Sequence, residues 1–152
     1  MTRIARTGGR VLLVDESGRI LLINEWLEDG STHWLTPGGG VEGDEDPRAA
    51  AVREALEETG IELSVPSDAE AVLVTRRDWE WGELEFDQVD YFFAVRVPDG
   101  TPVRPRKLTD VEQQTWIGTR WWTLDELRAT DVALLPPDIA DVLDRLLRAS
   151  GG

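Results

Sequence analysis

Short apolar runs alternate with polar and glycine-bearing segments along the chain, a pattern that predicts β-strands. The expected strands cover residues 11–14, 20–23, 71–75, 89–97 and 115–122. The polar residues 15–19 between the first two runs are typical of a hairpin turn. Residues 76–87 are polar and aromatic around a glycine, and we expect a hairpin or a protruding loop there. Residues 98–110 contain proline and glycine and are expected to be a connection.

Three segments have the period and the end signals of helices instead. The longest begins with Asp46 as N-cap and Pro47 at the first helical position, and Gly60 is expected to end it in a left-handed conformation. Thr123 is placed to cap a short helix. A last helix begins near Pro136 and carries one apolar stripe, made of Ile139, Val142, Leu143, Leu146 and Leu147.

Strands interleaved with helices predict an α/β domain whose sheet is covered by helices on both faces. With 152 residues, 41% of them hydrophobic, and seven tryptophans, the chain is expected to form a single domain over residues 1–152. It contains no cysteine, which excludes disulfides and thiolate metal sites. No apolar run resembles a signal peptide or a membrane span, so we expect a cytoplasmic protein with no membrane partner.

The helix that begins at Pro47 has a packing face and an acidic face. Its packing side gathers Val52, Ala55, Leu56 and Thr59. Three glutamates share nearly the opposite side, with Cβ atoms roughly 5–6 Å apart, namely Glu54, Glu57 and Glu58. For an isolated pattern of this kind the usual interpretation is a solvated charged face. Here the like charges follow a Gly-rich turn at residues 38–40, and the combination favours a site for a hard divalent cation.

The charge balance limits the partners. The chain has 30 acidic and 16 basic residues, a formal net charge of −14. Such a surface repels polyanions, which argues against a nucleic-acid partner bound through phosphate contacts. It is unfavourable for an anionic nucleotide too, unless a divalent cation neutralises the glutamates and bridges them to the phosphates.

Residues 39–61 resemble the signature of the Nudix hydrolases, G-x5-E-x7-R-E-U-x-E-E-x-G-U, in which U is apolar. Every position of that signature is filled here, by Gly39, Glu45, Arg53, Glu54, Ala55, Glu57, Glu58, Gly60 and Ile61. Segments around Trp34 and around Trp121 are also similar to that family, so the resemblance covers nearly the whole chain. It implies an α/β/α sandwich around a mixed sheet.

The resemblance also implies an activity, which is attack of water on a phosphorus of a nucleoside diphosphate linked to another group. The expected cofactor is Mg²⁺ or Mn²⁺. Its expected ligands are Glu54, Glu57, Glu58 and the Gly38 carbonyl. Arg53 is expected to pair with a neighbouring glutamate, such as Glu45, and to fix its rotamer; the alternative is a surface ion pair that contributes little.

The general base has two candidates. Glu54 is the first, and Glu112 is the second, because it precedes the tryptophan pair at 121–122 by about the distance at which relatives carry an additional metal-binding acid. The alternative for Glu112 is a solvated loop residue.

Candidates for substrate contacts lie in residues 76–87. Arg76 and Arg77 could bind phosphate or be strand-edge charges. The aromatic residues Trp79, Trp81 and Phe86 could stack on a base, although such residues more often pack a hairpin or a dimer interface. The single histidine, His33, has no partner pattern and is expected to be structural.

The substrate stays open at this stage. Markers of the ADP-ribose and dinucleoside polyphosphate subfamilies, a proline and a tyrosine after the signature, are replaced here by Arg76 and by Arg77, Asp78 and Trp79. Nucleoside triphosphates, nucleotide sugars and related small nucleotides remain candidate substrates. The competing classes are a non-catalytic nucleotide-sensing module, which would usually lack some of the carboxylates, and an acidic protein-interaction domain. A homodimer is compatible with the family and with the tryptophan content.

Overall fold

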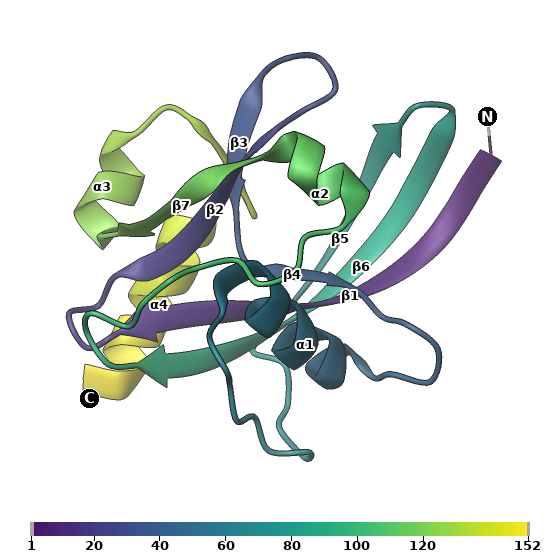
Figure 1. Cartoon of the computed structure of the whole chain (residues 1–152). Helices are drawn as coiled ribbons and strands as arrows, with labels where there is room; N and C mark the ends of the chain where they lie inside the picture. Colours follow the sequence, from purple (N-terminus) through teal and green to yellow (C-terminus); the bar gives the residue numbers. More distant parts are fainter. Residues whose placement is uncertain (1, 152) are drawn as a thin grey trace.

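The long strand β1 is the centre of a mixed, eight-stranded sheet in the computed structural model, which describes residues 2–151 (Figure 1). The strands are β1 Thr2–Asp15, β2 Ile20–Trp26, β3 Thr32–Leu35, β4 Gly38–Gly40, β5 Leu73–Trp81, β6 Leu84–Val97, β7 Trp116–Trp122 and β8 Ala133–Leu135. The helices are α1 Pro47–Thr59, α2 Asp110–Thr115, α3 Leu124–Ala129 and α4 Ile139–Gly151. The strand order is β5-β6-β1-β2-β3-β8, with β4 paired to β1 and β7 paired to β2.

The sheet divides at the first hairpin. β1 pairs with β6 in parallel along its whole length, from Thr2 opposite Leu84 to Asp15 opposite Val97. It meets β2 only at the turn, where Val14 is opposite Ile20. Beyond that point β2 continues with β3 and β7, while β4 takes the place beside β1. The two halves therefore diverge, and a cleft forms between them.

Apolar side chains pack on both faces of the sheet. Successive residues of a strand point to opposite faces, so Leu12 of β1 packs in the cluster that includes α4, and Leu13 packs in the cluster beneath α1. The apolar stripe of α4 contributes Ile139 and Leu143 to the first cluster, both fully buried. The structure confirms the predicted α/β/α arrangement.

Helix α1 begins and ends where the sequence predicts. The Asp46 carboxylate accepts a hydrogen bond from the Ala49 N–H at 2.7 Å. Gly60 has φ 74°, and its N–H donates to the Leu56 carbonyl, which closes the helix. Capping at both ends fixes the register of α1, and with it the directions of the glutamates.

Several elements differ from the predicted ones. The strands β1, β5 and β6 extend beyond their apolar runs, because backbone pairing continues through polar residues such as Arg6 and Gln88. Of the two alternatives for residues 76–87, the hairpin is confirmed, since β5 pairs with β6 up to Trp81 opposite Leu84. The short elements α2, β3 and β8 were not predicted, and residues 38–40, expected as a turn, form strand β4, since elements this short have no repeating apolar pattern. Helix α2 depends on a capping box, in which Thr109 and Glu112 exchange hydrogen bonds.

Among the described residues, no helix combines the length and the apolar character that crossing a membrane requires.

The contact between α1 and β1 requires a glycine at position 9. A Cβ added there would lie 1.8 Å from the Pro47 carbonyl oxygen, which belongs to the first turn of α1. Gly9→Ala should therefore displace the helix and lower the free energy of unfolding by about 1–3 kcal/mol. Chemical denaturation measures this loss.

Gly118→Ala is the matched control, because an added Cβ there meets no atom within 4 Å. Equal stability of the two variants would contradict the close approach at Gly9.

Candidate active site

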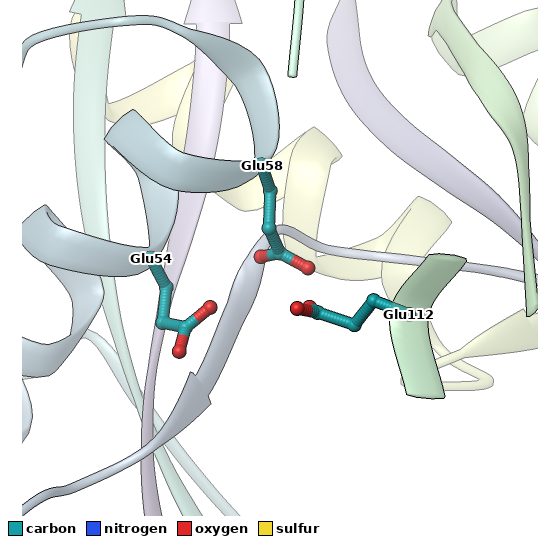
Figure 2. Close-up of side chains that lie close together, drawn as sticks. All are labelled: Glu54, Glu58 and Glu112. Atoms are coloured by element: carbon teal, nitrogen blue, oxygen red, sulfur yellow. The ribbon is translucent and has the colours of Figure 1, made fainter. Parts of the chain in front are cut away.

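Three carboxylates from two helices converge at one end of the cleft. Glu54 and Glu58 are one turn apart on α1, and Glu112 reaches toward them from α2 (Figure 2). One oxygen of each lies within 4.8 Å of the others. Glu54 is 8% exposed and Glu58 is 3% exposed, so the cluster is largely removed from solvent. A buried group of like charges is unstable unless protons or a cation compensate it.

The glycine strand β4 lies against this cluster. Backbone hydrogen bonds join Pro37 and Val41 to β1, and the alternation of an antiparallel ladder then turns the polar groups of Gly38 away from β1. The Gly38 N–H donates to Glu58 at 2.8 Å. A Cβ at Gly39 would lie 2.5 Å from Cδ of Glu54, so this position has room for the carboxylate only as glycine.

Arg53 connects the glutamates around it. Its guanidinium donates two hydrogen bonds of 2.9 Å to the carboxylate of Glu45 and one of 3.0 Å to the Gly40 carbonyl. It also donates to Glu54 at 2.8 Å and to Glu57 at 3.4 Å. The hydrogen bonds to Glu45 raise the pKa of Arg53 and lower that of Glu45. The expected pairing with Glu45 is present, and it is bidentate and part-buried.

Burial perturbs the two carboxylates of α1 in the same direction. It raises the pKa of Glu54 to about 7; the hydrogen bond from Arg53 opposes this shift, and the charge of Glu112 adds to it. Burial raises the pKa of Glu58 well above its ordinary value, and the charges of Glu54 and Glu112 add to that shift. Without a cation the cluster therefore retains protons.

The donor set fits a hard divalent cation. All three side chains offer carboxylate oxygens, which are the ligands that Mg²⁺ and Mn²⁺ prefer. One oxygen of each carboxylate is held by a hydrogen bond, from the Gly38 N–H for Glu58, from Arg53 for Glu54 and from the Thr109 N–H for Glu112. These contacts orient the ligand atoms in the manner of outer-shell partners.

A cleft of about 750 Å³ extends from the cluster between the two halves of the sheet. Its lining includes Gly38, Gly39 and the three clustered glutamates. It also includes the predicted substrate contacts Arg77 and Trp79. His33, expected to be only structural, lines the cleft as well, with its Nε2 3.7 Å from Glu25.

Two predicted site residues are not brought to the cluster or the cleft. Glu57 faces Arg53 and is not part of the three-carboxylate group; Glu112 completes it instead. Arg76 is exposed and does not line the cleft, because it alternates with Arg77 along β5. This placement fits the alternative of a strand-edge charge at Arg76, and a phosphate contact there stays a prediction.

Sequence reasoning missed two arginines of β1, Arg6 and Arg10, which line the cleft. Because they are four residues apart in a strand, their side chains lie on the same face of β1, and this spacing was the only signal for them in the sequence. The Gly8 and Gly9 pair between them hides it, because glycines interrupt any apolar alternation.

Comparison with known proteins agrees with this geometry. The family model of the NUDIX domain matches residues 5–146. An RNA pyrophosphohydrolase from Roseobacter denitrificans is 40% identical over 79 residues, which are 52% of this chain and 46% of that protein. The mRNA-decapping enzyme subunit 2 of Arabidopsis thaliana is 29% identical over 108 residues, 71% of this chain and 26% of that protein. The chain thus spans less than half the length of either relative.

A solved structure extends the match to nearly the whole chain. The MutT NUDIX hydrolase from Burkholderia pseudomallei is 26% identical, with a TM-score of 0.62, and the match covers 93% of this chain and 97% of that one. The similarity therefore includes the sheet and the helices on both of its faces.

The raised pKa of Glu54 makes the stability of the metal-free protein depend on pH. Because its folded pKa of about 7 exceeds its ordinary value of 4.5, the folded state binds more protons than the unfolded state between those values. The free energy of unfolding should then fall as pH rises through this window, by at most about 3 kcal/mol for Glu54. Thermal unfolding in EDTA between pH 5 and 8 measures the slope.

Glu54→Gln cannot titrate at this position and should reduce that slope to the part that Glu58 contributes, whereas the exposed Glu62→Gln should leave it unchanged. A wild-type slope retained in Glu54→Gln would show that this carboxyl ionises normally.

Proposed function

The chain belongs to the Nudix family, and from this premise we propose that it hydrolyses the pyrophosphate bond of a nucleoside diphosphate linked to another group, with a divalent metal as cofactor. One observation carries the proposal: three carboxylates of α1 and α2 converge beside the glycine strand at the end of a large cleft. A sensing module would need neither the cluster nor the bidentate support of Arg53.

Glu54, Glu58 and Glu112 are the residues that would hold Mg²⁺ or Mn²⁺, with Glu57 and the Gly38 carbonyl as further candidates beside them. When bound, the ion would neutralise the carboxylates, polarise phosphate oxygens and acidify a water molecule. The protein's own part is to hold the ligand oxygens in place through the Gly38 N–H and Arg53.

Glu54 remains the first candidate for the general base and Glu112 the second. One oxygen of Glu54 accepts from Arg53, so its other oxygen would serve either as a metal ligand or as the acceptor of a proton from the attacking water, and not as both. Glu112 is similar, with one oxygen committed to the Thr109 N–H.

The substrate proposed here is a small nucleotide. The net charge of −14 is unfavourable for a long polyanion. The 5′ end of an RNA is the second candidate, favoured by the printed name of the Roseobacter relative, an RNA pyrophosphohydrolase. Arg77 and Trp79 are proposed as substrate contacts because both line the cleft. The single domain, the cytoplasmic location and the homodimer stay predictions.

Hydrolysis of a nucleotide panel with Mg²⁺ or EDTA, followed by mass spectrometry of the products, tests the proposal. The panel spans nucleoside triphosphates, nucleotide sugars, ADP-ribose, dinucleoside polyphosphates and a 5′-triphosphorylated oligonucleotide. Turnover should require Mg²⁺. Glu54→Gln, Glu58→Gln and Glu112→Gln should each lower kcat by about 100-fold or more, since each removes a charged ligand oxygen.

Glu57→Gln should lower kcat less than these three variants, because Glu57 contacts Arg53 and lies outside the cluster. Glu62→Gln is the exposed control. Nucleotide binding without turnover of any panel member would favour the sensing module, and full activity of Glu58→Gln would exclude the cluster as the metal site.

Arg53 is proposed as a positioning residue, and Arg53→Lys tests that role. Lysine keeps the charge but cannot donate to Glu45, Gly40 and Glu54 together. We expect kcat to fall about 10- to 100-fold and the Mg²⁺ concentration at half-maximal rate to rise.

Arg48→Lys on the same helix is the control, since its guanidinium donates to the Val65 carbonyl, away from the cluster. An unchanged Mg²⁺ dependence in Arg53→Lys, with only a lower Tm, would reduce Arg53 to a structural role.

A further inference from the structure

Three neighbouring strands present their side chains to the cleft in rows. The pairing register aligns Arg6 of β1 with Gln88 of β6 and Gln88 with Arg77 of β5. Cα partners in a sheet point to the same face, so these side chains form one row across three strands. All three line the cleft. The next row aligns Ile4 with Phe86 and Phe86 with Trp79.

The row concentrates positive charge in a chain of net charge −14. Burial is the main cause that lowers the pKa of Arg6, and it lowers the pKa of Arg77 to about 10; the nearby charge of Arg10 adds to both shifts. Asp90 is 3.8 Å from Arg77 and offsets part of the charge. Within residues 2–151, Arg6 has no hydrogen-bonded or ion-paired side-chain partner.

Contacts within the protein already orient the side chains of the row. The Trp79 indole N–H donates to the Gln88 side-chain oxygen at 3.1 Å, and the Gln88 amide donates to Asp90 at 2.8 Å. The Trp79 ring stacks on Phe86, with centroids 4.1 Å apart. The guanidinium carbons of Arg6 and Arg77 lie 5.8 and 5.6 Å from the Trp79 ring centroid, within the range of a cation–π contact. Besides its proposed contact with the substrate, Trp79 therefore supports the two arginines.

The glycine strand connects the row to the carboxylate cluster. A Cβ at Gly40 would lie 2.6 Å from Nε of Arg6, and one at Gly39 would lie 2.5 Å from Cδ of Glu54. Adjacent residues of β4 thus separate the nearest arginine of the row from the nearest carboxylate. A ligand whose anhydride bond lies at the carboxylates would bring its next group over the row.

We propose that Arg6, Gln88 and Arg77 bind a further phosphate group of the substrate, next to the two phosphates that the cleaved bond joins, so that the substrate is a nucleoside carrying a chain of three or more phosphates. This inference rests on the proposed function. Guanidinium groups suit phosphate oxygens, and the Gln88 amide is already oriented beside them. A nucleotide sugar would place a neutral ring against these charges. A free nucleoside triphosphate and the triphosphate end of an RNA share the required chemistry.

Calorimetric titration with analogues that are not hydrolysed tests the subsite apart from catalysis. With Mg²⁺ present, the wild type is titrated with adenosine di- and triphosphates whose bridging oxygens are replaced by methylene groups. The third phosphate should improve affinity about tenfold or more, and Arg6→Gln and Arg77→Gln should each remove most of that gain. Arg76→Gln, the same change on the opposite face of β5, should keep it.

Equal weakening in Arg76→Gln and Arg77→Gln, no gain from the third phosphate, or no binding by the wild type would each overturn the subsite. Binding that depends on the row, without hydrolysis of any triphosphate, would overturn the proposed function alone. A 5′-triphosphorylated oligonucleotide forms the second arm. Binding that depends on Arg6 and Arg77 in either titration supports the subsite. The ligand that binds more tightly, the free triphosphate or the oligonucleotide, identifies the source of the phosphates.

Discussion

The close approach of α1 to the backbone of β1 and β4 is the constraint on which the site depends. It is allowed by the absence of a Cβ at Gly9, under the first turn of α1, and at Gly39, against the Glu54 carboxylate. Because the caps at Asp46 and Gly60 fix the register of α1, this approach also fixes where Glu54 and Glu58 point. A helix displaced outward by a side chain would lose the Gly38 N–H as the partner of Glu58. The same contact therefore packs α1 on the sheet and directs the carboxylates of Glu54 and Glu58.

The fold also places unfavourable charge on both sides of the glycine strand. Acidic groups gather at the edge of β4, and arginines gather on the face of the sheet beside it. Arg53 does not neutralise the acidic cluster, since its strongest contacts go to Glu45 and its charge is shared among several carboxylates. The cluster and the arginine row are complementary to a ligand that combines a cation with a phosphate chain. The protein alone compensates neither of them fully.

Local signals predicted α1, its caps and the carboxylates of the signature, because each depends on residues a few positions apart. They could not decide between Glu57 and Glu112, since that choice depends on α2, a short helix brought to α1 by a connection without periodicity. They also could not find the row of Arg6, Gln88 and Arg77. Its members are far apart in the chain, and only the register of β1, β6 and β5 aligns them. A one-residue slip would exchange Arg77 for Arg76 in the cleft.

The carboxylates and the arginine row come from different elements of the fold, so one group can change without the other. The clustered carboxylates come from α1 and α2, whereas the arginine row comes from β1, β6 and β5. The backbone of Gly39 and Gly40 lies between Arg6 of the row and Glu54 of the cluster. On the proposal that the row binds a phosphate, substitutions along it would change which group lies beside the cleaved bond and would leave the clustered carboxylates where they are. Because the row follows a strand register and not a sequence signature, matching the signature alone identifies the reaction class but not the substrate.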